Sequence, residues 1–285
     1  MAQTVFSGAA FTITHTCEET GPHHTRNNAY YNESLTITAL IRGSGSCFVE
    51  GTCYSPLPGE LILTRADELR CWNMVQEGAH ERLSLYFSPD ITSICREYRL
   101  PLLQLFQNHA PGIGNQCSLL EEDRDGWQVL MDIRRIVAEA QDNADELTQA
   151  ELHLLILRLL MRLCRIQSSA AADCTQHGSD PATENVCRYI REHLAETLTY
   201  QHIQDQCHVS RYQLGEVFHR STGLTLTEYI IRKRLIQAAQ LIRSGEGIER
   251  AAASAGFHTY SHFYKEFVRR NGQSPKQYFK NTQHI

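Results

Sequence analysis

The first third of the chain is rich in β-branched and aromatic residues, which are interrupted by Gly, Pro and Asn. The segment Leu35–Ile41 alternates between apolar and polar residues and runs into Gly43-Ser44-Gly45-Ser46, a pattern that predicts a strand followed by a hairpin turn. A second tight turn is predicted at Glu50-Gly51. Further short strands are predicted at residues 47–49, 61–63 and 83–87. Short strands at regular spacing, with no helical pattern between them, predict a small antiparallel barrel or sandwich over residues 1–88.

The apolar period changes to that of a helix after Pro89. Residues 119–141 predict an amphipathic helix, and Leu147–Ile166 predicts a second helix with a wider apolar stripe. The two are expected to form a helical hairpin within residues 89–167, and the stripe is a candidate dimerisation surface. Its members are Leu152, Leu155, Leu159 and Leu163. The alternative is that this helix packs only on its own β domain.

Residues 168–182 have no periodic apolar pattern and consist mainly of small and polar residues, which predicts a flexible linker. Near its end, Asp180 and Pro181 have the character of a helix N-cap and a first helical residue. A helical domain is therefore predicted over residues 183–285.

The helical domain contains one pattern twice, because six positions of like chemistry recur at an offset of 49 residues. In each copy a hydroxyl residue, Ser210 or Thr259, opens a helix, and apolar residues follow four apart. A glycine, Gly223 or Gly272, ends the helix. The other matched positions are Leu214 with Phe263, Phe218 with Phe267, Thr225 with Ser274, and Tyr229 with Tyr278.

A short helix, a tight turn and a second helix with a polar outer face predict a helix-turn-helix unit in each copy. The inward-facing apolar residues leave polar, aromatic and basic side chains outside, where they can meet base edges in a major groove. These outer positions are Tyr212, Gly215 and Glu216 in the first copy, and Tyr260, Ser261, Tyr264 and Lys265 in the second. Residues 226–242 predict a long helix that holds the two units at a fixed separation.

Charge is divided unevenly along the chain. Residues 184–285 hold 14 Lys and Arg against 9 Asp and Glu, a balance of +5, whereas residues 1–183 hold 13 against 23, a balance of −10. A basic end beside two such helices favours a polyanionic partner over a merely solvated surface. Candidate phosphate contacts, which add affinity without sequence information, are Arg211, Arg232, Arg269, Arg270 and Lys276.

The segment Ile248–Tyr278 resembles the C-terminal signature of AraC/XylS-type transcription regulators. The resemblance rests on Gly256-Phe257, Phe263, Phe267, Gly272 and Ser274-Pro275, and on the pattern from Ser210 to Tyr229 followed by Arg234 and Ala238. It covers about 100 residues and implies a domain that binds double-stranded promoter DNA. By position it implies base contacts at Tyr212, Glu216, Tyr260, Ser261, Tyr264 and Lys265.

The first unit departs from the family pattern in three places. Gln204 and His208 stand where the family usually has Ala and Gly, and Gly215 has no side chain with which to contact a base. We therefore expect the second unit to read the DNA sequence more closely than the first.

The N-terminal part resembles the cupin-like sensory barrel of the same family. The similar segments are Ile41–Gly45, Pro58–Leu63 and Glu81–Phe87. The resemblance implies a ligand-binding domain, with a sugar or another small polar metabolite as the expected effector.

Many cupins hold a catalytic metal through histidines and a carboxylate, for which His23, His24 and Glu33 are partial candidates here. Arg70 stands in the region of the later histidine and would repel a metal ion, so no catalytic metal site and no cofactor are expected. Arg70 and Trp72 suit a carboxylate or a polyhydroxy ligand instead. The candidate ligand-binding residues are His24, Arg26, Arg70, Trp72, Arg82 and Ser84.

The composition is that of an ordinary globular protein, 42% hydrophobic and 21% charged over 285 residues, a length that suits two domains. The sequence shows no apolar run of membrane-spanning length and no secretory signal, from which a cytoplasmic protein is expected. The ten cysteines are scattered without a paired metal-type spacing, and we interpret them as reduced thiols.

These patterns together predict an α+β fold, in which a cupin-like antiparallel β-barrel with a helical hairpin precedes an all-α domain with two helix-turn-helix units. The predicted function is sequence-specific transcription regulation by an effector-controlled homodimer, with RNA polymerase as a further candidate partner. No enzymatic activity is predicted. Two alternatives remain open: a metal-dependent cupin enzyme with a helical appendage, and a regulator whose barrel binds a protein partner.

Overall fold

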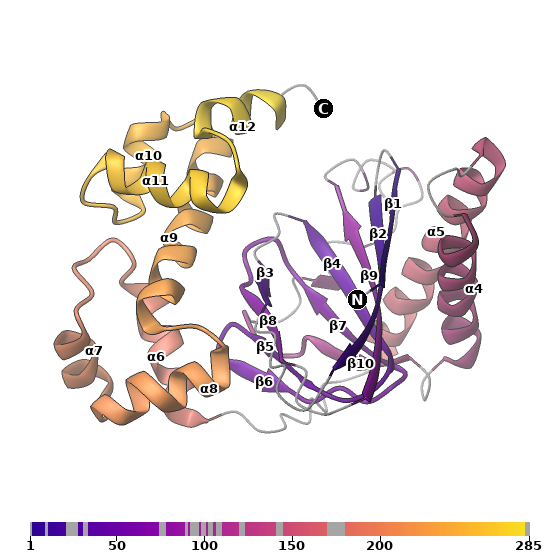
Figure 1. Ribbon diagram of the computed structural model, residues 1–285, viewed down its shortest axis with the longest axis horizontal. Helices are drawn as coiled ribbons and strands as arrows, with labels where there is room; N and C mark the ends of the chain where they lie inside the picture. The colour runs from indigo at the N-terminus through magenta and orange to yellow at the C-terminus, as the bar shows by residue number, and fades with distance from the viewer. Residues whose placement is uncertain are drawn as a thin grey trace. The chain divides into compact units, whose positions relative to one another are not determined.

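The chain forms two compact units in the computed structural model (Figure 1), a first unit of Met1–Gly178 and a second of Ser179–Ile285. The division falls inside the segment that was predicted as a linker. The structure describes residues 2–8, 11–20, 28–30, 34–73, 78–88, 91, 97, 101, 105–106, 110–119, 123–140, 145–169 and 180–282.

The first unit is built on two antiparallel sheets. The larger has strand order β1-β2-β9-β4-β7-β10, and the smaller has order β3-β8-β5-β6. The predicted α+β class is confirmed, but the described strands form two separate sheets instead of one closed barrel, because none of them pairs with both sheets. The strands are β1 (Ala2–Ser7), β2 (Phe11–Thr20), β3 (Asn28–Tyr30), β4 (Leu35–Arg42), β5 (Ser46–Val49), β6 (Thr52–Tyr54), β7 (Glu60–Thr64), β8 (Arg70–Asn73), β9 (Gly78–Phe87) and β10 (Gln116–Ser118).

The hairpin predicted at residues 43–46 is wrong. Strand β4 pairs with β7 and β9 in the larger sheet, whereas β5 pairs with β6 and β8 in the smaller one. Gly43, with a φ of 97°, carries the chain from one sheet to the other. A corner and a hairpin use the same turn residues, so the local pattern does not separate them. The tight turn at Glu50-Gly51 is confirmed, because Val49 and Thr52 pair across it.

Two helices, α4 (Arg124–Ala140) and α5 (Glu146–Ser169), form the predicted hairpin. They lie against one face of the larger sheet (Figure 1). Alternate residues of β2 and β9, such as Ile13 and Leu85, are fully buried in a core shared with Ile133 of α4. This face of the sheet therefore provides the main hydrophobic core of the first unit.

The second unit is helical throughout its described part, and its long helix α9 runs between two groups of shorter helices (Figure 1). The first group comprises α6, α7, η1 and α8, and the second comprises α10, α11 and α12. Their bounds are α6 (Pro181–Glu192), α7 (Tyr200–Cys207), η1 (Gln213–Val217), α8 (Phe218–Thr222), α9 (Leu226–Arg243), α10 (Ile248–Ser254), α11 (Tyr260–Asn271) and α12 (Pro275–Thr282).

The predicted helix ends of the second unit are confirmed. The Asp180 carboxylate accepts a hydrogen bond of 3.0 Å from the first turn of α6. Ser210 and Gln213 form a capping box, in which each backbone N–H donates to the other's side chain at 2.7 and 3.2 Å. Gly223 and Gly272 end α8 and α11 with φ near 70° (70° and 69°), as glycine C-caps do.

A buried arginine ties α9 to the end of α6. The Arg234 guanidinium donates from Nε to the Leu194 carbonyl at 3.0 Å and from Nη2 to the Glu196 carbonyl at 2.7 Å. Gly256 packs against the same place, since a Cβ there would lie 2.2 Å from the Leu194 carbonyl oxygen. Its φ of 92° also favours glycine. The turn between α10 and α11 is thereby held against the end of α6.

No helix in the described part of the chain is both long and apolar enough to span a bilayer. The cysteines that the structure describes are free thiols. Cys47 and Cys71 are fully buried, as expected for small apolar residues of the β domain.

His208 ends α7 with a left-handed backbone of φ 55°, at the position where the sequence departs from the family's usual glycine. A residue with a Cβ pays roughly 1–2 kcal/mol for this conformation. We predict that His208→Gly raises the free energy of unfolding by about 0.5–1 kcal/mol, once the greater freedom of glycine in the unfolded chain is counted. Urea-induced unfolding of the full chain would measure this change.

His219→Gly is the matched control, because His219 is also exposed but lies inside α8. Because histidine itself favours a helix less than alanine does, glycine in its place is expected to lower the free energy of unfolding by a few tenths of a kcal/mol. Equal losses in the two variants would contradict strain at His208.

Candidate functional site

The second helix of the first helix-turn-helix unit is formed by η1 and α8. Its first part is π-helical, a form often found at functional sites. Leu214 and Phe218 hold its inner side and are each 1% exposed. Tyr212, which is 60% exposed, and Glu216 lie on the outer side, as predicted, with Gly215 in open space between them. Gly215 thus leaves one position of this outer face without a side chain that could contact a base.

The corresponding helix of the second unit is α11. The Thr259 hydroxyl caps it by accepting a hydrogen bond from the His262 backbone N–H at 3.2 Å. Phe263 and Phe267 are buried on the inner side. The four predicted base contacts of this unit are exposed on the other side, and they are Tyr260, Ser261, Tyr264 and Lys265.

The two tyrosines of this outer face are close neighbours, with ring centroids 6.2 Å apart between Tyr260 and Tyr264. Partial burial, helped by the negative charge of Glu249, raises the pKa of Tyr260. Its hydroxyl therefore keeps its proton at neutral pH and can both donate and accept a hydrogen bond. Together with Lys265, these side chains suit the mixed donors and acceptors of a major groove.

The predicted phosphate contacts are not equally available. Arg211 and Lys276 are exposed, whereas Arg232 on α9 is only partly exposed.

Arg269 and Arg270 share one carboxylate of their own helix. The Glu266 Oε2 atom accepts hydrogen bonds from Arg269 Nη2 at 2.8 Å and from Arg270 Nη1. Burial acts to raise the pKa of Glu266, but its bonds to Arg270 and Arg269 outweigh this and lower the pKa. Glu266 therefore stays charged at neutral pH and cancels one of the two positive charges. The Arg270 side chain is 19% exposed, which argues against the predicted phosphate contact there.

A cavity of about 70 Å³ lies between the two sheets of the first unit. Arg82 and Ser84 reach it from β9, and Arg70 and Trp72 reach it from β8. Four of the six predicted ligand-binding residues therefore line one cavity. The candidates that lie outside the described residues are His23, His24, Arg26 and Glu33.

Arg70 brings a positive charge to a fully enclosed position. Its side chain is buried, with the residue 3% exposed, and Nη1 donates to Thr64 Oγ1 at 2.6 Å. The guanidinium carbon also lies 5.5 Å from the centre of the Tyr86 ring. Neither partner is an anion, so the charge is only partly compensated by the described residues.

Arg82 brings a second positive charge to the cavity. Its guanidinium carbon lies 5.4 Å from the centre of the Trp72 ring. The nearest described carboxylate is Glu18, whose Oε1 atom is 4.0 Å from Arg82 Nη2. Two arginines against one carboxylate leave the described lining with a net positive charge.

Several lining residues were missed in the sequence. They are polar residues that face the cavity from the larger sheet, namely Gln3, Thr14, Thr16, Glu18, Thr38 and Tyr86. A signal was present, because Thr12, Thr14, Thr16 and Glu18 are polar at every second position and therefore share one face of a strand. The hydroxyls of Thr38 and Ser84 are 3.2 Å apart and can bond each other or a ligand.

The leucines predicted as the dimerisation surface lie inside the first unit, so this prediction is wrong. Leu152, Leu159 and Leu163 are at most 1% exposed, and all belong to the core between α5, α4 and the larger sheet. Leu155 is partly buried against the same core. These side chains already have partners in their own chain, so they are not available to a second copy. The alternative, packing on the chain's own β domain, holds for this face.

The opposite side of α5 carries an apolar stripe that the prediction overlooked. Leu147, Leu154 and Met161 are 78%, 69% and 40% exposed and follow one another at seven-residue intervals. Ala150 and Leu157 fill the intervening positions, so that the stripe has the a and d spacing of a coiled coil. We call these five residues the heptad stripe.

Comparison with known proteins bears mainly on the second unit. Residues 203–281 match the family described as "Helix-turn-helix domain". The HTH-type transcriptional activator RhaS of Citrobacter koseri is 28% identical over 173 residues, which are 55% of this chain and 60% of that protein, so the chain matches about three fifths of that relative's length. RhaS of Escherichia fergusonii is 28% identical over 256 residues, or 87% of this chain and 86% of that protein.

Among solved structures, ToxT from Vibrio cholerae with a bound unsaturated fatty acid is similar at a TM-score of 0.44 and 15% identity, over 98% of this chain and 96% of that one.

Proposed function

Because the chain belongs to the AraC/XylS family of transcription regulators, we propose that it is a cytoplasmic, effector-controlled regulator that binds promoter DNA through both helix-turn-helix units. The observation that carries the proposal is the pair of capped helices whose outer faces hold exposed polar, aromatic and basic side chains. RNA polymerase is the further partner expected of an activator. The effector is proposed to bias how the DNA-binding units engage their site.

The second unit is proposed to supply most of the sequence discrimination. Its outer face offers Tyr260, Ser261, Tyr264 and Lys265, whereas Gly215 offers no side chain at the centre of the first unit's outer face. Lys265 is the strongest candidate, because an exposed ammonium can donate to guanine acceptors in the major groove.

We predict that Lys265→Ala weakens binding to a DNA sequence selected by the full chain from a random pool, by about 1–3 kcal/mol. Binding to random duplex should change far less. Equilibrium titration of labelled duplexes at several salt concentrations would measure both affinities.

Lys276→Ala is the matched control, since this exposed lysine of α12 is proposed to contact phosphate. It should weaken selected and random DNA alike and reduce the salt slope by about 1. If Lys265→Ala also lowered both affinities equally, its proposed contact with a base would be wrong.

The cavity is proposed to bind a small, hydroxylated ligand that carries an anionic group. Arg70 is buried without an anionic partner among the described residues, so a ligand carboxylate would supply the missing charge. The surrounding hydroxyls of Thr14, Thr16 and Ser84 suit polyol groups. About 70 Å³ holds roughly five water molecules at about 10–15 Å³ each, which favours a compact effector over a long acyl chain.

We predict that a sugar acid raises the melting temperature of the full chain, and that the neutral parent sugar at equal concentration raises it less. Thermal unfolding with a panel of such pairs would measure the shifts, since a ligand that binds only the folded state stabilises it. Arg82→Met should reduce the difference between acid and neutral sugar, because it deletes one of the two cavity charges but keeps the side chain's bulk, while Arg70 remains.

Arg135→Met is the control, as this exposed arginine of α4 is no part of the cavity. A panel in which no polar metabolite shifts the wild-type melting temperature would contradict a polar effector and favour the alternative in which this domain binds a protein. A metal-dependent cupin enzyme is disfavoured by the positive charge of Arg70 inside the cavity, which would repel a metal ion there.

A homodimer is proposed to form through the heptad stripe. The charges beside the stripe favour antiparallel pairing of two α5 helices, in which Leu154 of one copy meets Leu157 of the other. That register places Glu151 of one copy near Arg158 of the other, and these opposite charges attract. Parallel pairing would instead place Glu146 of one copy near Glu151 of the other, and these like charges repel. All three charged residues are exposed on α5.

We predict that Leu154→Glu combined with Met161→Glu converts the dimer to a monomer, because it puts charges into the apolar interface. Sedimentation velocity of the full chain would measure the mass. Gln149→Glu, an exposed change outside the stripe, should leave the dimer intact. A monomeric wild type, or a double variant that remains dimeric, would remove the stripe from the interface.

A further inference from the structure

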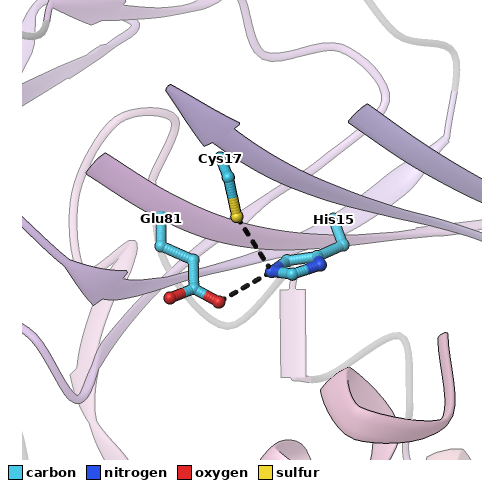
Figure 2. A group of neighbouring side chains, drawn as sticks. All are labelled: His15, Cys17 and Glu81. Atoms are coloured by element: carbon cyan, nitrogen blue, oxygen red, sulfur yellow. Dashed lines mark hydrogen bonds and ion pairs between the residues drawn. The ribbon is translucent and has the colours of Figure 1, made fainter. Parts of the chain in front are cut away.

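A histidine, a cysteine and a carboxylate converge on the side of the larger sheet that faces α4 (Figure 2). His15 and Cys17 are two residues apart on β2 and point to the same face. Glu81 lies directly opposite Cys17 on β9. One ligand atom from each residue can be chosen so that all lie within 4.8 Å of one another.

The imidazole Nε2 of His15 stands at the centre of this group (Figure 2). It lies 2.7 Å from Glu81 Oε1 and 3.5 Å from Cys17 Sγ. A single Nε2 proton can satisfy only one of these acceptors well. A cation placed between the three atoms would bind all of them at once.

The three ligand types are those of a zinc site, in which nitrogen, sulfur and oxygen ligands lie about 2.0–2.3 Å from the ion. Tetrahedral geometry with these bond lengths puts the nitrogen and sulfur ligands roughly 3.6 Å apart, close to the observed spacing of His15 and Cys17. The nitrogen and oxygen ligands would be roughly 3.4 Å apart, so the Glu81 carboxylate would need to withdraw by about 0.7 Å.

We propose that His15, Cys17 and Glu81 bind a zinc-like divalent transition-metal ion, with a fourth position left to solvent. The His15 and Glu81 side chains are 9% and 13% exposed and Cys17 is partly exposed, so an ion can reach a site that is otherwise enclosed. Such a mixed set of nitrogen, sulfur and oxygen ligands favours zinc over magnesium or calcium, which prefer oxygen.

Arg134 of α4 competes with the ion for Glu81. Its Nε donates to Glu81 Oε1, the same oxygen that contacts His15. Without a metal ion, the Arg134 guanidinium neutralises the negative charge of Glu81. The Arg134 side chain is 38% exposed, so it can move into solvent when an ion binds. Removing this arginine should therefore strengthen metal binding, an effect that a purely structural ion pair would not produce.

The site is separate from the effector cavity. Residues of β2 alternate in direction, so that His15 and Cys17 face the helices while Thr14, Thr16 and Glu18 line the cavity on the other face. The proposal therefore does not depend on the proposed effector, and it assigns no catalytic step to the ion.

The test is a zinc titration of the full chain, stripped of metal with a chelator and kept reduced, in competition with a chromophoric chelator. We expect one equivalent to bind. Cys17→Ser should weaken the affinity by at least about tenfold, and Arg134→Gln should strengthen it several-fold. Cobalt(II) in place of zinc should give a thiolate charge-transfer band that disappears in Cys17→Ser.

Cys164→Ser is the matched control, because Cys164 is another partly exposed cysteine, on α5 and outside the cluster. It should leave the zinc affinity unchanged. Circular dichroism would verify that each variant is folded, and the wild-type cobalt spectrum tests the site even if a variant does not fold. Absence of the thiolate band in the wild type would overturn the proposal, as would full zinc affinity in Cys17→Ser.

Discussion

The two-residue period of the β2–β9 ladder is the constraint on which the first unit depends. Ile13 pairs with Leu85 on the face that packs against α4 and α5, and the next pair, Thr14 with Ser84, faces the cavity. The hydrophobic core, the lining of the cavity and the cluster at His15 therefore all follow from one register. A slip by one residue would exchange the two faces and lose all three features together.

The second unit depends on a different kind of contact, in which a buried charge is satisfied by backbone carbonyls. Arg234 donates hydrogen bonds to the backbone carbonyls of Leu194 and Glu196 just beyond α6. Gly256 has no Cβ, which leaves room for the Arg234 side chain and the Leu194 carbonyl. Arg234 lies in the middle of the long helix α9. These contacts, together with the apolar core between α9, α10 and α11, hold the turn before α11 in place, and none of them uses the exposed residues that would meet DNA.

Helix α5 shows how one element can serve two surfaces. Its buried leucines complete the core of its own unit, which explains why they dominate the apolar pattern of the sequence. The heptad stripe, beginning at Leu147, lies on the other side and is exposed. In the proposed dimer, association and folding would therefore not compete for the same side chains, and the exposed stripe can be changed without opening the core.

Local features were determined by the sequence itself. The caps at Ser210 and Thr259, the length of the helices and the outer face of α11 all depend on residues within one or two turns of each other. Only the tertiary structure decided that the turn at Gly43 is a corner between sheets, and which face of α5 is buried. It also brought Glu81 next to His15, 66 residues away in the chain. These outcomes rest on pairing between distant segments, which local periodicity does not record.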